Sequence, residues 1–386
     1  MASRHSRPRA GRPARRASDR REPVRYAVVG LGWIAQSAIL PAFANARRNS
    51  VLAALVSDDP VKLRKLGRKY HVDRLYAYED YHRCLREENL DAVFIALPNT
   101  MHRQYTEAAA AAGVHVLCEK PLATTESDCE AMIEACRDAR VKLMVAYRLH
   151  FERANLEAVE TVRSGKLGEP RIFHSVFTNR VEPGNVRLRG GEGGALFDIG
   201  IYCLNAARYL FRAEPEEALA WHVTGDDRRF GEVPEMTAAV LRFPGNRLAS
   251  FTCSFGASGV AAYEIVGTRA SLRVDPAYSI AEDLVHRFTR ERKTRTRVFK
   301  ARDQFAPELL YFSDCIRNDK RPEPSGEEGL ADVRALRALE ESARTGRRVK
   351  LEPLERDARP QLGQAIARPV PPVPELVHAK DPTPST

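Results

Sequence analysis

The chain has 386 residues, 44% of them hydrophobic and 29% charged, which is typical of folded globular proteins and predicts two or three domains. No apolar run approaches the ~18 residues of a membrane-spanning helix, and the seven scattered cysteines include no Cys-x-x-Cys pair, so we expect a cytoplasmic protein without a membrane partner, disulfides or a metal site. The formal charge of +10 would suit nucleic acid, but residues 1–22 supply +6 of it, so no specific nucleic-acid partner is expected.

Residues 1–22 are predicted to form a disordered basic arm. This segment carries eight arginines and lacks the apolar residues that could bury a core. A solvated or partner-docked arm is the preferred interpretation. Nonspecific contact with a polyanion and a transit peptide are the alternatives.

Residues 23–147 are predicted to form a dinucleotide-binding Rossmann domain with a parallel sheet. Short apolar runs alternate here with helical segments, and strands that are apolar along their whole length are buried on both faces. The predicted strands are 24–29, 51–57, 92–97, 114–118 and 142–146. The predicted helices are 33–46, 60–70, 101–112 and 125–139.

A G-x-G-x-x-A motif lies directly between the first strand and the first helix. Gly30 permits the tight turn, Gly32 lets a pyrophosphate approach the backbone, and Ala35 keeps the helix close to the strand. A structural turn that binds nothing is the alternative. The residues expected to contact the cofactor in this loop are Gly30, Leu31, Gly32, Trp33 and Ile34.

The end of the second strand bears on the choice between NAD and NADP. A carboxylate here accepts a hydrogen bond from the ribose 2′-hydroxyl, whereas a 2′-phosphate needs small or cationic neighbours. Ser57 and Lys62 favour the phosphate and Asp58 favours the bare hydroxyl. Asp58 and Asp59 also suit the capping of the next helix. We expect NADP, with NAD as the alternative.

Two short segments contain the candidate catalytic residues. Lys120 follows a predicted parallel strand, where ligands sit in open α/β sheets, and Pro121 holds it out of helical geometry. Asp198 and Tyr202 are four residues apart at the start of a predicted helix, so they project to one side of its first turn. The structural alternatives are a surface lysine, a helix N-cap and a half-buried aromatic ring.

Residues 148–351 are predicted to form a second α/β domain with a large, mostly antiparallel sheet, because several strands follow one another with turn residues between them. Its predicted strands are 171–178, 217–224, 236–243, 247–254, 261–267, 270–274, 284–289 and 295–300. Its predicted helices are 152–164, 199–211, 305–317 and 327–345. Residues 352–386 are predicted to form a flexible, proline-rich tail.

Several motifs occur together and in order along the chain, and together they carry a family resemblance. They are the Gly30–Ala35 loop, Ala96-Leu97-Pro98-Asn99 with His102, Glu119-Lys120-Pro121, Tyr147-Arg148 and Asp198 to Tyr202. On these motifs the chain resembles the Gfo/Idh/MocA family of oxidoreductases. It is most similar to the branch that contains glucose–fructose oxidoreductase and related NADP-dependent aldose dehydrogenases.

The resemblance implies roles for individual residues. Lys120 would lie beside the nicotinamide and the reacting oxygen, Glu119 would contact the cofactor ribose, and Arg148 would lie near the nicotinamide. Tyr202 stands where most relatives have histidine, and the glucose–fructose branch shares the tyrosine. The resemblance also implies self-association through the sheet of the second domain. The residues that would line the cofactor's path are Leu97, Pro98, Asn99 and His102.

The sequence therefore predicts an NADP-dependent oxidoreductase that oxidises the anomeric hydroxyl of an aldose, of glucose or xylose type, to a lactone. A phenol is a poor base near neutral pH unless a cation stabilises its phenolate, and Lys120 would supply that charge to Tyr202. Asp198 would orient the sugar hydroxyls. The cofactor would either exchange freely or stay bound while a second sugar is reduced. The alternatives are an NAD-dependent dehydrogenase of an inositol or sugar acid and a non-enzymatic cofactor-binding regulator.

Overall fold

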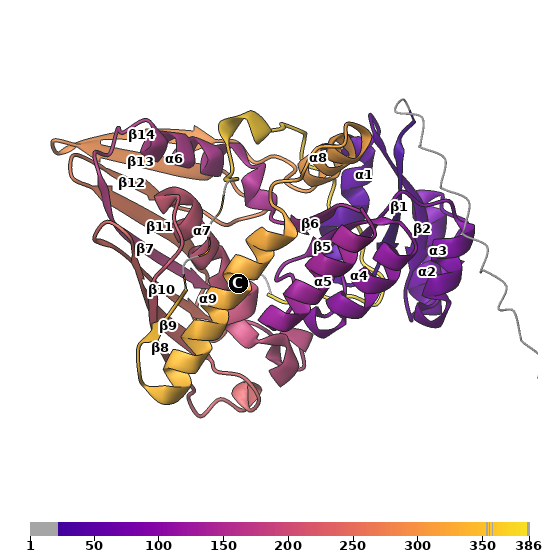
Figure 1. Ribbon diagram of the computed structural model, residues 1–386, viewed down its shortest axis with the longest axis horizontal. Helices are drawn as coiled ribbons and strands as arrows, with labels where there is room; N and C mark the ends of the chain where they lie inside the picture. Colours follow the sequence, from indigo (N-terminus) through magenta and orange to yellow (C-terminus); the bar gives the residue numbers. More distant parts are fainter. Residues whose placement is uncertain (1–21, 353, 355, 357, 384–386) are drawn as a thin grey trace, which may run out of the picture.

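The computed structural model describes residues 22–352, 354, 356 and 358–383 and contains two domains, each built on one sheet (Figure 1). The basic arm predicted for residues 1–22 lies outside the described residues, apart from Glu22. Within the described ranges, none of the helices combines the length and the apolar character needed to cross a membrane.

The first domain is a six-stranded parallel sheet in the order β3-β2-β1-β4-β5-β6, which confirms the predicted Rossmann-type architecture. Its strands are β1 (Val24–Val29), β2 (Ser50–Val56), β3 (Leu75–Tyr76), β4 (Ala92–Ile95), β5 (His115–Glu119) and β6 (Leu143–Ala146). Its helices are α1 (Leu40–Ala46), α2 (Pro60–Tyr70), α3 (Tyr81–Glu87), α4 (His102–Ala111) and α5 (Glu126–Asp138).

The second domain is a nine-stranded sheet in the order β14-β13-β12-β11-β7-β10-β9-β8-β15, in which only β7 and β10 pair in parallel. Its first strands are β7 (Pro170–Thr178), β8 (Glu217–Val223), β9 (Met236–Phe243), β10 (Arg247–Ser254) and β11 (Val260–Gly267). The remaining strands are β12 (Ser271–Val274), β13 (Leu284–Arg290), β14 (Lys293–Phe299) and β15 (Val349–Lys350). The predicted mostly antiparallel sheet is confirmed.

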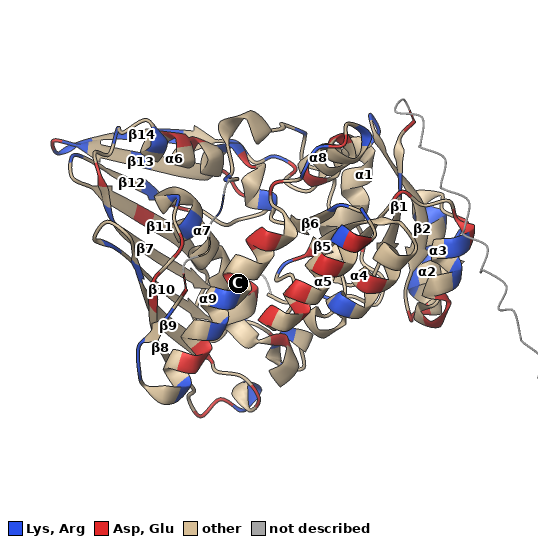
Figure 2. Ribbon diagram, in the orientation of Figure 1, with Lys and Arg blue, Asp and Glu red and all other residues tan. Residues whose placement is uncertain are grey.

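Helices α6 (Arg153–Arg163), α7 (Ile201–Phe211) and α9 (Gly326–Thr345) lie on one side of the large sheet, whereas α8 (Ala306–Arg317) returns to pack against α1 of the first domain (Figure 1). The other face of the sheet carries no helix in the described chain. Figure 2 shows acidic and basic residues interspersed along the ribbons of both domains.

The predicted elements differ from the structure mainly at their ends and at three short pieces. The two-residue strands β3 and β15 and helix α3 were not predicted, because none of them is long enough to show a hydrophobic period. Two predicted helices begin with a π-helical turn, over Ala35–Ile39 before α1 and over Leu196–Gly200 before α7. The second of these turns contains Asp198, so this aspartate lies within the helical run and does not cap it.

A buried cluster of charges joins α7 to α9. The guanidinium of Arg208 is fully buried and contacts three carboxylates: Asp332 at 2.5 Å, Glu328 at 2.7 Å and Glu214 at 2.5 Å. Arg359, beyond the last strand, adds a second cation 2.7 Å from Glu214. Since each charge depends on the others for compensation in a low-dielectric interior, the cluster specifies how these segments dock.

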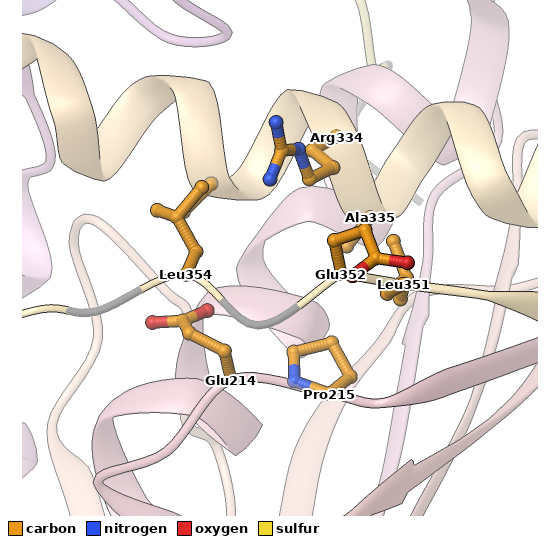
Figure 3. Close-up of a pocket in the computed structure, with 8 residues that line it drawn as sticks. Glu214, Pro215, Arg334, Ala335, Leu351, Glu352 and Leu354 are labelled. Atoms are coloured by element: carbon orange, nitrogen blue, oxygen red, sulfur yellow. The ribbon is translucent and has the colours of Figure 1, made fainter.

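The proline-rich segment follows a defined path along both domains, although its composition predicts a flexible tail. Gln364 donates to the Glu323 carboxylate at 2.7 Å, and the Asn45 amide donates to the carbonyl of Pro369 at 2.8 Å. Where this segment leaves β15, it borders a depression of about 10 Å³, too small for a sugar or a nucleotide (Figure 3). The residues labelled around it in Figure 3 are Glu214, Pro215, Arg334, Ala335, Leu351, Glu352 and Leu354.

Replacing the buried arginine should destabilise the protein strongly. Arg208→Met leaves the buried carboxylate of Asp332 without its cation, so we expect a loss of ~3–5 kcal/mol in the free energy of unfolding. Glu214 and Glu328 lose one cation each and keep Arg359 and Arg356, respectively. Urea denaturation measures this loss. Arg163→Met is the matched control, because Arg163 is 59% exposed and, among the described residues, pairs with Glu160 alone, on its own helix. Equal stability of the two variants would contradict a structural role for the cluster.

Candidate active site

The loop after β1 has the shape expected of a phosphate-binding turn. Gly30 has φ of +91°, and a Cβ there would lie 2.3 Å from the carbonyl oxygen of Ala96, so only glycine fits. A Cβ on Gly32 would meet nothing within 4 Å, which leaves open space over the backbone. Leu31 is buried, while Trp33 and Ile34, both partly exposed, open the helix. Open space at Gly32 beside a helix N-terminus suits the pyrophosphate of a dinucleotide.

The end of β2 presents mixed charges. Ser57 is buried, and its hydroxyl accepts a hydrogen bond from the Asp59 amide at 3.2 Å. Asp59 caps α2 by accepting from the amides of Val61 and Lys62 at 2.8 and 3.1 Å, as its position predicts. Asp58 is exposed, and the Lys62 ammonium has no ion-pair partner in the described part of the chain. Ser57 thus shapes the turn, and Asp58 and Lys62 remain available to a ligand.

His102 corrects one expectation of the sequence. The side chain is completely buried, so it does not line an open path for a cofactor. Its Nε2 lies 3.0 Å from the carbonyl oxygen of Leu97, and its Nδ1 lies 3.0 Å from that of Pro121. Burial lowers the pKa of His102, which favours the neutral ring. A neutral ring donates through one nitrogen only, so His102 packs between the Leu97–Asn99 loop and the Lys120–Pro121 segment and hydrogen-bonds to one of them. It is a positioning residue.

A glycine-rich loop of the second domain closes onto the first at Asn99. The Glu192 carboxylate accepts from the backbone amide of Asn99 at 2.6 Å and from the Thr100 hydroxyl at 3.0 Å. The Asn99 side chain donates to the carbonyl of Glu192 at 2.9 Å. Pro98 precedes these contacts and is partly exposed. Glu192 was not predicted, because its partners lie about ninety residues away.

Lys120 and Asp198 form the central ion pair of the site. The Lys120 ammonium, on the residue after β5, donates to a carboxylate oxygen and to the carbonyl oxygen of Asp198, both at 2.8 Å. The other carboxylate oxygen of Asp198 lies 2.7 Å from Nε of Arg187. Burial alone would raise the pKa of Asp198, but Arg187 and Lys120 outweigh it and lower this pKa to about 2. Burial opposes the charge on Lys120, yet Asp198 holds its pKa above the ordinary value.

Tyr202 lies between two cations. The Lys120 ammonium is 5.0 Å and the Arg148 guanidinium carbon 4.9 Å from the centre of the Tyr202 ring. The Nε atom of Arg148 donates to the phenolic oxygen at 3.3 Å. The rings of Phe177 and Tyr278 lie 5.7 and 6.0 Å away and fix the plane of Tyr202. The structure thus brings Lys120, Asp198, Tyr202 and Arg148 to one place from distant parts of the sequence.

Residues that the sequence did not single out hold Arg148 and surround it. The guanidinium donates to the carbonyl of Tyr278 at 2.6 Å and to the side chain of Gln304. Burial raises the pKa of Glu119 to about 7, although Lys120 and Arg148 act against it. Glu308 is fully buried, neither of its carboxylate oxygens has a hydrogen-bond partner within the described part of the chain, and burial and Glu119 raise its pKa. Gln304 and Glu308 belong to no local motif that could have pointed to them.

Two family models match the chain. A model described as an oxidoreductase family with an NAD-binding Rossmann fold matches residues 24–147, and one described as the GFO/IDH/MocA C-terminal domain matches residues 155–273. Together these matches cover more than half of the sequence, with the whole parallel sheet and the strands of the large sheet from β7 to β11.

Individual relatives agree with the family models. A D-xylose 1-dehydrogenase [NADP(+)] of Haloarcula marismortui is 33% identical over 86% of this chain and 94% of its own length. The crystal structure of an aldose-aldose oxidoreductase from Caulobacter crescentus, complexed with glycerol, is 38% identical, with a TM-score of 0.82 over 86% of this chain and all of that one. A 3-ketoreductase from Actinomadura kijaniata, in complex with NADP and TDP-benzene, is 25% identical with a TM-score of 0.76 over 83% of this chain and 98% of that one.

The two glycines of the phosphate loop should respond differently to alanine. Gly30→Ala places Cβ against the Ala96 carbonyl, so we expect a loss of thermal stability in the protein without ligand. Gly32→Ala fills only open space, so we expect unchanged stability but at least about tenfold weaker dinucleotide binding, since the methyl group enters the pyrophosphate cradle. Thermal denaturation and calorimetric titration separate the two effects. Full dinucleotide affinity in Gly32→Ala would place the cofactor elsewhere.

Proposed function

Because the chain belongs to the Gfo/Idh/MocA family of oxidoreductases, we propose that it is an NADP-dependent sugar dehydrogenase that oxidises the anomeric hydroxyl of an aldose to the lactone. The observation that carries this proposal is the placement of Tyr202 between the cations of Lys120 and Arg148. The similarity to a D-xylose dehydrogenase and to an aldose-aldose oxidoreductase supports an aldose of xylose or glucose type.

The Gly30–Ile34 loop and the end of β2 would hold the dinucleotide, and Glu119 would accept a hydrogen bond from a ribose hydroxyl. When bound, the nicotinamide supplies the acceptor for the hydride that leaves the sugar carbon. The protein then has to remove one proton, the one on the sugar hydroxyl. Loss of that hydride and that proton converts the hemiacetal carbon to the carbonyl carbon of a lactone.

Tyr202 is the residue that takes the proton. Its oxygen accepts a hydrogen bond from Arg148, and the charge of Lys120 lies over the same ring, so negative charge that develops on the phenolic oxygen is compensated on two sides. Asp198 keeps Lys120 in place and has lone pairs left to accept hydrogen bonds from a second sugar hydroxyl. The buried aromatic rings beside Tyr202 exclude water from the reacting atoms.

One variant of this proposal and two alternatives to it differ in how the cofactor is used. A cofactor that stays bound would let the enzyme reduce a second sugar, as the name of the Caulobacter relative suggests for that protein. The exposed carboxylate of Asp58 favours the alternative of an NAD-dependent dehydrogenase of an inositol or a sugar acid. A cofactor-binding regulator is less compatible with the Lys120–Tyr202 arrangement, since a regulator needs no proton-transfer group.

A panel of substrates tests the reaction. Initial rates with NADP and with NAD should be highest for NADP with an aldopyranose, and the product should be trapped as the lactone or its acid. Absorbance of the freshly purified protein near the reduced-nicotinamide band, before and after xylose or glucose is added, reports whether a cofactor travels with the enzyme. Turnover of inositols with NAD, but not of aldoses, would favour the alternative.

Loss of the phenol or of the ammonium should slow catalysis sharply. Tyr202→Phe and Lys120→Ala are each expected to lower kcat/KM by about 10²-fold or more, the usual scale of acid–base assistance. Tyr70→Phe, at a half-buried ring, and Lys65→Ala, at an exposed side chain, both lie on α2; they are the matched controls and should keep full activity. Near-normal turnover of Tyr202→Phe would remove the phenol from the mechanism.

The open face of the large sheet supports a proposal of self-association. Large apolar side chains project from this face on neighbouring strands, and in-register pairing places Leu248 beside Ile172. Such a patch on a soluble protein is typical of an interface, and a second copy of the chain would cover it. The apolar side chains on this face that are at least 36% exposed are Ile172, Trp221, Val223, Val240, Leu248, Val260 and Val298.

A charge on this face should dissociate the oligomer. Leu248→Lys is expected to shift the sedimentation coefficient from that of an oligomer to that of a monomer, because burying an unpaired ammonium at an interface is unfavourable. Val373→Lys, at a side chain that is 96% exposed, is the control and should leave the assembly unchanged. A wild-type protein that sediments as a monomer at micromolar concentration would contradict self-association through this face.

A further inference from the structure

Residues 375–382 pass along the first domain beside the phosphate loop and then contact the second domain. The backbone of Val377 both donates to and accepts from the side-chain amide of Gln36, at 2.8 and 2.9 Å. His378 lies with Nδ1 2.8 Å from a carboxylate oxygen of Asp59. The carbonyl of Pro382 then accepts from the backbone amide of Glu182, after β7 in the second domain. The segment therefore spans both domains.

The contact with Gln36 is specific. Gln36 is 1% exposed, and its amide also donates to the carbonyl of Leu31 in the phosphate loop at 2.8 Å. Among the described residues, Val377 alone donates to the Gln36 side-chain oxygen, so losing the segment would leave this buried oxygen without its donor. Upstream, the carbonyl of Glu375 accepts from Lys69 on α2 at 3.2 Å. These bonds hold residues 375–378 between the phosphate loop and α2.

The segment runs along the edge of the Rossmann domain where the adenosine half of a dinucleotide binds. The pyrophosphate rests on the loop after β1, and the adenosine ribose lies at the end of β2, near Ser57 and Asp58. Val377 is bonded through Gln36 to the first of these sites, and His378 is bonded to Asp59 at the second. The segment lies outside residues 24–147 and 155–273, which the family models match.

The carboxylates at the end of β2 disfavour a 2′-phosphate unless another group of the protein engages them. Asp58 and Asp59 are adjacent carboxylates, and a phosphate beside them would be repelled. The amides of Val61 and Lys62 occupy one oxygen of Asp59, and His378 occupies the other. The imidazole thus engages the one carboxylate oxygen that the helix cap leaves open.

We propose that residues 375–382 form a strap over the adenosine end of the cofactor groove, and that His378 lets the site accept the 2′-phosphate of NADP by engaging the Asp59 carboxylate. This inference rests on the proposed NADP-dependent function. The strap slows cofactor release because both of its ends are tied, one to each domain. His378 acts on specificity, because its partner lies beside the only position at which NADP differs from NAD.

The test measures dinucleotide binding and release by the full-length protein without sugar. Calorimetric titration gives Kd for NADP and NAD, and stopped-flow displacement gives the release rate. Deletion of residues 375–386 should weaken both nucleotides and speed their release. His378→Ala should weaken NADP by about tenfold and leave NAD within about twofold, as expected for one uncompensated charge near the phosphate. Lys380→Ala, at an exposed residue of the same segment, is the control.

A double variant tests the charge argument directly. Asp59→Asn keeps a helix-capping side chain and removes the charge, so His378→Ala/Asp59→Asn should regain the NADP affinity that His378→Ala loses. His378 is exposed, so its variants keep the fold even if the deletion does not.

Each outcome is decisive. Equal or tighter NADP binding by both the deletion and His378→Ala would overturn the strap and leave the proposed function intact. Failure of the double variant to recover would overturn the role of His378 in specificity. A wild-type protein that binds neither nucleotide would overturn the proposed function, and the strap with it.

Discussion

The ion pair between Lys120 and Asp198 is the interaction on which the rest of the site depends. The ammonium belongs to the first domain and the carboxylate to the second, and both side chains are largely shielded from water. Because Lys120 also donates to the carbonyl of Asp198, the start of the helical run is held in register with the end of β5. That register places Tyr202, four residues further on, beneath the same ammonium.

Around this pair the protein arranges charges that suit a dinucleotide and a sugar. Arg148 and Lys120 supply positive charge to the phenol, while Arg187 and Lys120 keep Asp198 ionised at any physiological pH. Glu119, with a pKa near 7, and the buried Glu308 lie on the same side as Arg148. The Leu97–Asn99 loop, which would line the cofactor path, contacts His102 at Leu97 and Glu192 at Asn99.

The two domains are also connected through contacts that do not involve the catalytic groups. Helix α8 returns to the first domain after the last long strand of the large sheet, and α9 packs against α5, where Arg334 lies 2.8 Å from Glu126. The segment around Val377 and His378 then crosses the first domain once more. A groove between two domains opens only as far as such connections allow, so the chain after α9 is part of what defines the cofactor site.

Local patterns in the sequence determined the architecture and half of the site. Alternation and flanking turn residues gave β9 and β10 with their observed bounds, and the Asp59-Pro60 start and apolar spacing gave α2. The sequence also predicted that position 30 requires glycine, because a tight turn after a strand needs a positive φ there. Tertiary structure alone decided that Arg148 contacts Tyr202, Tyr278 and Gln304, that His102 is buried, and that His378 meets Asp59. The reason is physical: pairs separated by 54 to 319 residues share no period along the chain, so only packing in three dimensions brings them within hydrogen-bonding distance.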